Sequence, residues 1–124
     1  MELTLLPGSF AVCRLAPDAV LPAPSGHSLW SVTRTADEIS VVCEDREAPT
    51  GSRIEPGWAA LRVEGPIAFT EIGVVAGIST RLAEAGVSIF VVSTFDTDYV
   101  LVKHERLRDA IAALESAGYR IANP

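Results

Sequence analysis

The order of secondary-structure signals in the second half of the chain restricts the fold more than any other feature. Two runs rich in β-branched and aromatic residues, Val87–Val92 and Tyr99–Val102, are joined by a short polar connection, which is typical of a hairpin. An amphipathic segment stands on each side of this pair, Ile72–Ala85 before it and Glu105–Ala117 after it, and a further apolar run lies outside each segment. The predicted order is strand–helix–strand–strand–helix–strand, the split βαβ or ferredoxin-like arrangement.

Apolar residues recur at three- and four-residue steps in both amphipathic segments, so each is predicted to be a helix with one buried face. Gly86 and Gly118 follow the two helices, where left-handed C-terminal caps are expected. Both helices are expected to cover one face of a four-stranded antiparallel sheet, whose other face the first half of the chain or a second copy would cover. The predicted inward residues are Ile72, Val75, Ile78, Ser79, Leu82 and Ala85 in the first helix, and Leu107, Ala110, Ile111 and Leu114 in the second.

The first half of the chain is predicted to be mostly strand and to lack full-length helices. Its strand-like runs are Leu3–Leu6, Phe10–Leu15, Leu29–Thr33 and Ile39–Cys43. The charged segment Glu44–Gly57, rich in Pro and Gly, alternates poorly and is interpreted as a linker. We therefore expect a strand-rich N-terminal sub-domain with its linker over residues 1–57 and a ferredoxin-like α+β domain over residues 58–124.

Composition limits the possible partners. A chain of 124 residues can bury a real core, and its formal net charge is −6 without a basic stripe. This charge argues against binding to nucleic acid or to an anionic membrane surface. The N-terminus lacks the pattern of a signal peptide, and no apolar run approaches the roughly 20 residues that span a bilayer, so a soluble cytoplasmic protein is expected. Cys13 and Cys43 lack metal-site spacing and are predicted to be buried, reduced thiols.

Signatures of catalysis are missing from the sequence. It contains no HxxxH, CxxC, phosphate-binding loop or nucleophile elbow, and the segment from Gly73 to Gly77 does not match the dinucleotide motif. His27 and His104 are far apart in sequence, and nothing supplies a base for Ser93 as a nucleophile. We expect no catalytic residue, no metal site and no cofactor, so an enzyme is disfavoured.

The second half of the chain resembles the ACT domain, a small-molecule regulatory module of amino-acid metabolism. The residues that carry the resemblance are Gly73 at the start of the first helix, the helix end Leu82–Gly86, and the strand Val87–Ile89 that runs on towards Ser93 and Thr94. The connection and strand from Ser93 to Val102 are similar to a branch of small bacterial tandem ACT-like proteins related to a cytosolic arginine sensor. Segments Ser31–Thr35 and Glu38–Val42 resemble the first-half signature of that branch.

This resemblance implies an ACT-like N-terminal half beside a complete ACT domain, with a ligand held in a cleft where two such units meet. Carried over by position, the ligand-binding residues would be Glu71, Gly73, Val74, Thr94, Phe95 and Asp98, with Ser31 and Val32 in the N-terminal half. The expected ligand is an amino acid, and the expected assembly is a homodimer that acts on a regulated partner protein.

The chemistry of these positions suits an α-amino acid. Unpaired N–H groups at a helix start near Gly73 can bind a carboxylate, while Asp98 or Glu71 can bind an ammonium group or a cationic side chain. Each residue also has a purely structural interpretation. Gly73 suits close packing of helix on sheet, Asp96 and Asp98 suit the turn itself, and Glu71 suits the helix dipole.

Two functions follow from the sequence. The first is a non-catalytic amino-acid sensor, and the second is an assembly module of the same fold that binds no metabolite. A thermal shift with an amino acid would distinguish them.

Overall fold

The computed structural model of the protein describes residues 1–26, 28–65, 68 and 72–123. The chain divides into two compact units. The C-terminal unit consists of Met1–Pro7 and Ala59–Pro124, and the N-terminal unit is Gly8–Trp58. No helix in the described ranges is long and apolar enough to cross a membrane.

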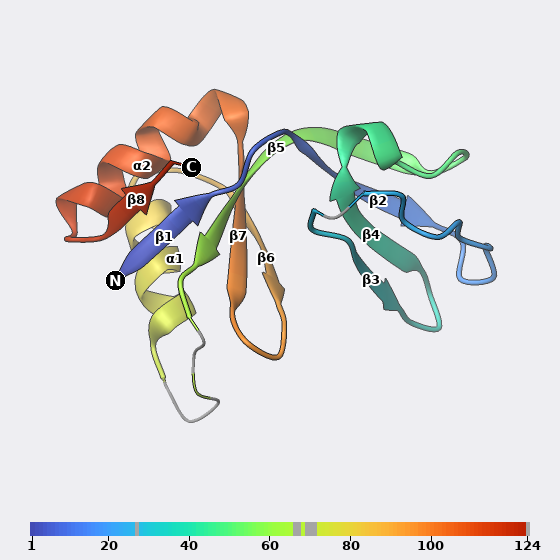
Figure 1. Ribbon diagram of the computed structural model, residues 1–124, viewed down its shortest axis with the longest axis horizontal. Helices are drawn as coiled ribbons and strands as arrows, with labels where there is room; N and C mark the ends of the chain where they lie inside the picture. The colour runs from blue at the N-terminus through green and yellow to red at the C-terminus, as the bar shows by residue number, and fades with distance from the viewer. Residues whose placement is uncertain (27, 66–67, 69–71, 124) are drawn as a thin grey trace. The chain divides into compact units, whose positions relative to one another are not determined.

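The C-terminal unit has the predicted order of elements, with one additional strand at its start (Figure 1). Its short 3₁₀ turn η2 (His104–Arg106) leads directly into the second helix. The elements are β1 (Glu2–Leu5), the second part of β5 (Arg53–Val63), α1 (Val74–Glu84), β6 (Ile89–Ser93), β7 (Asp98–Lys103), α2 (Leu107–Ser116) and β8 (Arg120–Ala122). The fold is the ferredoxin-like α+β arrangement that the sequence predicted.

The sheet of this unit differs from the prediction in one strand. Among the described residues it has five strands in the order β6-β7-β5-β1-β8, because β1 lies between β5 and β8. Strand β1 pairs antiparallel with β5 and parallel with β8, so the expected four-stranded antiparallel sheet was wrong on both counts. The short run Leu3–Leu6, assigned by sequence to the N-terminal half, thus completes the sheet of the C-terminal unit.

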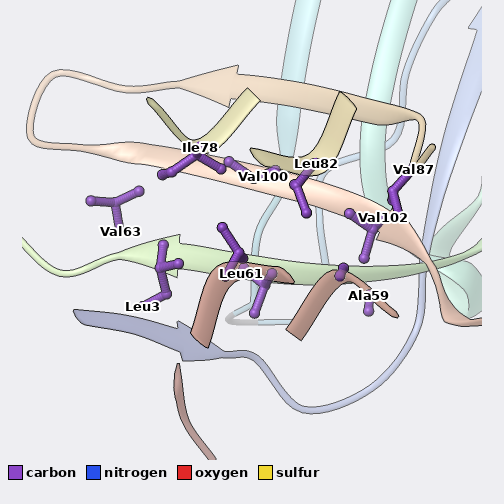
Figure 2. Packing of buried hydrophobic residues seen from close by; sticks show 11 residues of the cluster. Leu3, Ala59, Leu61, Val63, Ile78, Leu82, Val87, Val100 and Val102 are labelled. Carbon is purple, nitrogen blue, oxygen red and sulfur yellow. The ribbon is translucent and has the colours of Figure 1, made fainter. Parts of the chain in front are cut away.

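Alternate residues of the strands face the two helices. Ala59, Leu61 and Val63 of β5 point to the same side, as the two-residue period of a strand requires, and all three are fully buried. Figure 2 shows Ile78 and Leu82 of α1 above β7 in this core. The buried cluster consists of Leu3, Ala59, Leu61, Val63, Ile78, Leu82, Val87, Val100, Val102, Ala110 and Leu114.

Both helices end as predicted. Gly86 and Gly118 have φ values of 72° and 94°, in the left-handed region that glycine adopts without strain. After α1, the Val87 N–H donates to the Leu82 carbonyl at 2.9 Å, which completes a Schellman cap. The start of α1 differs from the prediction: Ile72 precedes the helix and is 91% exposed, so it does not share the buried face.

The N-terminal unit consists of antiparallel strands and contains no α-helix within its described residues. Its strands are β2 (Phe10–Leu15), β3 (Ser31–Arg34), β4 (Ile39–Glu44) and the first part of β5, in the order β3-β4-β2-β5. This confirms a strand-rich layer. Its buried cluster is smaller, consisting of Ala11, Cys13, Leu15, Ile39, Val41 and Cys43.

Both cysteines are free and buried, as predicted. They lie on neighbouring strands, with Ala11 opposite Cys43 and Cys13 opposite Val41. Burial raises the pKa of the Cys13 thiol, and it raises the pKa of Cys43 to about 12. Both groups are therefore protonated thiols at neutral pH.

The segment interpreted as a linker is largely structured. It contains the 3₁₀ turn η1 (Asp45–Glu47), and from Arg53 onward it belongs to β5, which pairs with β2. Phe10 is opposite Trp58 and Val12 is opposite Glu55, so β5 has one residue more than β2 at this point. Pro56 and Gly57, with φ of 82° at the glycine, thus form a β-bulge rather than the end of a linker. The expected boundary between residues 57 and 58 falls inside β5, one residue before the division between the two units.

Candidate functional site

A pocket of about 340 Å³ lies in the C-terminal unit, between the first turn of α1 and the β6–β7 connection. Helix α1 provides amide groups to this pocket, and the connection provides hydroxyl and carboxylate groups. The lining residues are Ala68, Gly73, Val74, Val75, Ala76, Ser93, Thr94, Phe95, Asp96, Thr97 and Asp98. We call this hollow the α1–turn pocket.

The start of α1 presents backbone N–H groups to the pocket. Gly73 occupies the N-cap position with a φ of 82°, and being a glycine it offers no side chain to cap the helix. The first intrahelical bond from this end runs from the Gly77 N–H to the Gly73 carbonyl at 2.9 Å. The amides of Val74, Val75 and Ala76 come before this bond, where the helix supplies no acceptor. They form the electropositive end of the pocket.

The structure also explains the glycine at position 73. A Cβ atom there would meet no described atom within 4 Å, so close packing does not require glycine. The positive φ does, because residues with a side chain adopt it only under strain.

The β6–β7 connection has a fixed internal structure. The Thr94 N–H donates to the Thr97 carbonyl at 2.8 Å, and the Thr94 hydroxyl donates to the same carbonyl at 3.1 Å. In return, the Thr97 N–H donates to the Thr94 hydroxyl oxygen at 3.3 Å. The Thr94 side chain thereby makes hydrogen bonds to the backbone of Thr97 that close the turn, with Phe95 and Asp96 at its tip.

Two further hydrogen bonds fix the position of the connection. The Thr97 hydroxyl donates to the carbonyl oxygen of Val63, the last residue of β5, at 2.6 Å. The Ser93 hydroxyl donates to Asp98 Oδ1, also at 2.6 Å. One bond ties the turn to the neighbouring strand, and the other orients a carboxylate that lines the pocket.

The charged and dipolar groups of the pocket come from two different elements. Asp96 and Asp98 provide two carboxylates on the connection, while α1 contributes the positive end of its dipole. Within the described ranges no Lys, Arg or His lines the pocket. This arrangement suits a small molecule with a negative group near the helix and a positive group near the turn.

Five of the eight residues predicted from sequence line this one pocket: Gly73, Val74, Thr94, Phe95 and Asp98. Glu71 lies outside the described residues. Ser31 and Val32 lie on β3 of the N-terminal unit and do not line the pocket. Sequence reasoning missed Ser93 and Thr97 as parts of the site. The pair of threonines three residues apart was the available signal, because such hydroxyls often bond locally to the backbone.

A second hollow of about 360 Å³ shares Thr94, Asp96 and Thr97 with the first. The Arg62 guanidinium there bonds Glu64 at 3.0 Å, and the Thr4 hydroxyl donates to the same carboxylate. The Thr4 hydroxyl, followed by Arg62, lowers the pKa of Glu64 below its ordinary value. Arg62, the arginine that lines this second hollow, is thus already paired with a carboxylate.

Comparison with protein families identifies both halves of the chain. The family model described as "ACT domain" matches residues 53–116, which is just over half of the chain. A separate family model for an N-terminal domain matches residues 8–51.

The curated relatives are much longer than this chain. It is 28% identical over 102 residues to the human protein "Cytosolic arginine sensor for mTORC1 subunit 1", a match that covers 76% of this chain and 31% of the relative. The bovine protein of the same name is 37% identical over 59 residues, covering 47% of this chain and 18% of that protein. The chain thus spans about a third of the length of the human relative, and less of the bovine one.

Solved structures match the whole fold. A protein from Agrobacterium tumefaciens is 38% identical with a TM-score of 0.90, and the match covers 99% of this chain and 92% of that one. The aspartate kinase of Clostridium acetobutylicum has a TM-score of 0.65 at 18% identity, covering 88% of this chain and 32% of the enzyme. The second likeness concerns the fold alone.

Proposed function

The chain belongs to the ACT domain family, and on that premise we propose that it is a non-catalytic regulatory module that binds a free amino acid. The observation that carries this proposal is the polarity of the α1–turn pocket. It combines helix amides that have no intrahelical acceptor, on α1, with the carboxylates of Asp96 and Asp98 on the β6–β7 side.

An α-amino acid matches this polarity group by group. Its carboxylate would accept hydrogen bonds from the first amides of α1, where Gly73 leaves the backbone open to approach. Its ammonium group or a cationic side chain would pair with Asp98, a charge-assisted contact of the stronger kind. A dicarboxylate would fit poorly, because the described lining offers it no cationic side chain.

The mechanism we propose is a shift between populations, without chemistry. An amino acid that binds one arrangement of the protein more tightly than another favours that arrangement, by as much as the two affinities differ. We also propose Glu71, Ser31 and Val32 as ligand-binding residues, on the family resemblance alone. The arginine sensor relatives support a regulatory role rather than a catalytic one.

Apolar exposure beside the pocket supports a homodimer or a protein partner. Phe95, at the tip of the turn, is 79% exposed, and Ile72, just before Gly73, is 91% exposed. Both flank the same end of α1, and large apolar side chains at a pocket rim are typical of surfaces that another chain covers.

Thermal denaturation of the purified protein with each of the twenty amino acids at millimolar concentration tests the proposal. A ligand of the folded state raises the unfolding free energy by about 2.7 kcal/mol at a hundredfold excess over Kd. That corresponds to a rise in Tm of several degrees for a domain of this size. No shift with any amino acid would refute amino-acid binding.

Two variants sharpen this test. Asp98→Asn should abolish the shift with little effect on the unliganded Tm. Asp18→Asn removes the same charge from an exposed residue of the N-terminal unit and should leave the shift unchanged. Equal shifts in both variants would remove Asp98 from the site.

The second candidate is an assembly module that binds no metabolite, which the exposure of Ile72 and Phe95 favours. It predicts a stable dimer by light scattering, loss of that dimer in the double variant Ile72→Ser/Phe95→Ser, and no thermal shift with any amino acid. An amino-acid shift in a monomeric protein would exclude it.

A further inference from the structure

The carboxylate of Asp98 is oriented before any ligand binds. The Ser93 hydroxyl holds its Oδ1 atom at 2.6 Å, across the first pair of residues after the turn, where Ser93 and Asp98 are opposite each other on β6 and β7. A carboxylate that already accepts one hydrogen bond cannot rotate freely about its side-chain bonds. The second oxygen, Oδ2, is then presented in a fixed direction.

The turn that bears this carboxylate is also anchored. The Thr97 hydroxyl donates to the Val63 carbonyl at 2.6 Å, which joins the turn to a strand 34 residues earlier in the chain. The backbone of Thr97 is held in turn by the hydroxyl and N–H of Thr94. The connection is therefore held in two ways besides its covalent links to β6 and β7: by the bonds between Thr94 and Thr97, and by the bond from Thr97 to β5.

We propose that Ser93 and Thr97 are positioning residues of the amino-acid site. Ser93 occupies Asp98 Oδ1 and leaves Oδ2 to receive the cationic nitrogen of the ligand, while Thr97 fixes the distance between the turn and the end of β5. This inference rests on the proposed function. Its physical basis is preorganisation, because a site that is ordered in advance loses less entropy when the ligand binds.

Neither hydroxyl is needed by the core of the unit. Ser93 is exposed and Thr97 is half-buried, and the buried cluster contains only apolar side chains. Removal of either hydroxyl should therefore change ligand affinity more than the stability of the unliganded protein. That separation distinguishes a positioning role from a merely structural one.

Two pairs of matched variants test the proposal. Thr97→Val keeps the shape of the side chain and removes its hydroxyl, whereas Thr97→Ser keeps the hydroxyl. Ser93→Ala and Ser93→Thr form the equivalent pair. Wild type and all four variants are first heated with each of the twenty amino acids. Calorimetric titration then gives Kd for the amino acid that shifts the wild type most.

We expect Thr97→Val and Ser93→Ala to raise Kd about fivefold to tenfold, because the turn or the Asp98 carboxylate must then be ordered when the ligand binds. Thr97→Ser and Ser93→Thr should remain within about twofold of wild type on the same scale. Unliganded Tm values should differ little among the five proteins. If Thr97→Val fails to fold, the Ser93 pair carries the test alone.

The outcomes separate this inference from the proposed function. A wild type that no amino acid stabilises overturns both. A wild type that binds, with Thr97→Val and Ser93→Ala binding equally well, overturns this inference alone. Equal losses of affinity in the variants that keep the hydroxyl would also overturn it, since the hydroxyl would then not be the group that matters.

Discussion

The two units of this protein are both built on β-strands and share β5, but they cover their strands differently. The C-terminal unit lays two helices on its sheet and buries a cluster of eleven residues with them. The N-terminal unit has no α-helix among its described residues, and its buried cluster has six members, two of which are cysteines. The α1–turn pocket belongs to the unit with helices, because it needs a helix start beside a hairpin end.

The comparison of the two units indicates where a binding site can form in such a fold. Inner strands of a sheet pair almost all of their amides with neighbouring strands, whereas a helix start leaves several amides without an intrahelical acceptor. Both tryptophans, Trp30 and Trp58, lie in the N-terminal unit, while the two α-helices of the described residues lie in the other. Tryptophan fluorescence and helical circular dichroism can therefore follow the two units separately.

The largest effect is expected from a cavity in either core. Leu82→Ala removes a fully buried side chain of α1 and should lower the free energy of unfolding by about 2–5 kcal/mol. Denaturant titration followed by circular dichroism measures this loss. Ile39→Ala is the matched change in the N-terminal unit and should shift the fluorescence transition by a similar amount. A loss below about 1 kcal/mol in either would contradict the assigned core.

The next effect concerns the left-handed residue at the start of α1. Gly73→Ala should destabilise the protein by about 1–2 kcal/mol, because alanine is strained at a φ of 82°. Gly73→Asn should cost less, since asparagine tolerates this region better. Thermal melts followed by circular dichroism compare the two. Equal Tm values for both variants would show that φ is not the reason for the glycine.

A smaller effect is expected at the other end of α1. The Arg106 guanidinium donates to the carbonyls of Gly86 at 3.0 Å and Ala85 at 3.3 Å, so a side chain near the start of α2 caps the end of α1. Arg106→Ala should lower stability by about 0.5–1.5 kcal/mol, with the lower end favoured by its partial exposure. The control Arg108→Ala, an exposed residue of α2, should change stability by less than about 0.5 kcal/mol. Equal losses would remove the capping role.

The smallest effect is a pH dependence confined to the N-terminal unit. Glu47 Oε1 accepts hydrogen bonds from the Ser25 hydroxyl at 2.5 Å, the Ser25 N–H at 2.9 Å and the Gly26 N–H at 2.8 Å. The Ser25 hydroxyl is the largest cause that lowers the pKa of Glu47 in the folded protein. A lowered folded pKa stabilises the fold above the unfolded pKa, and this contribution is lost as the pH falls through the folded pKa.

Acid titration of the fluorescence stability curve measures that contribution. The loss should begin near pH 4.5, the ordinary pKa of the carboxyl group, and Glu47→Gln should remove this part of the pH dependence. An identical acid profile in wild type and Glu47→Gln would show that the hydrogen bonds to the Glu47 carboxylate do not contribute to the pH dependence of stability.

Local patterns were sufficient to predict most elements of the fold. The helical period of α2 and the glycine caps at 86 and 118 depend only on near neighbours, and the structure agrees with them. The position of β1 could not be predicted in this way, because Leu3 pairs with Ile121 at the other end of the chain. Similarly, Pro56 and Gly57 look like the end of a linker in sequence, and only the pairing of β5 with β2 makes them a bulge.

The candidate site was likewise predicted only in part. Family resemblance brought together five residues that line one pocket, although they come from segments about 20 residues apart. It gave no hint of the Thr97 bond to Val63, whose acceptor is a backbone carbonyl that sequence does not distinguish from any other. The contacts that shape the pocket were thus harder to predict than the residues that line it.

The two buried thiols of the N-terminal unit can report the rate at which its sheet opens. A thiol reagent attacks the thiolate, and neither Cys13 nor Cys43 is ionised or accessible while β2 and β4 remain paired. Each modification event must therefore wait for the strands to separate. At saturating reagent, the rate at which the native protein reacts equals the rate at which this small sheet opens. Comparing that rate with and without an amino acid would reveal whether occupancy of the α1–turn pocket, in the other unit, slows the opening.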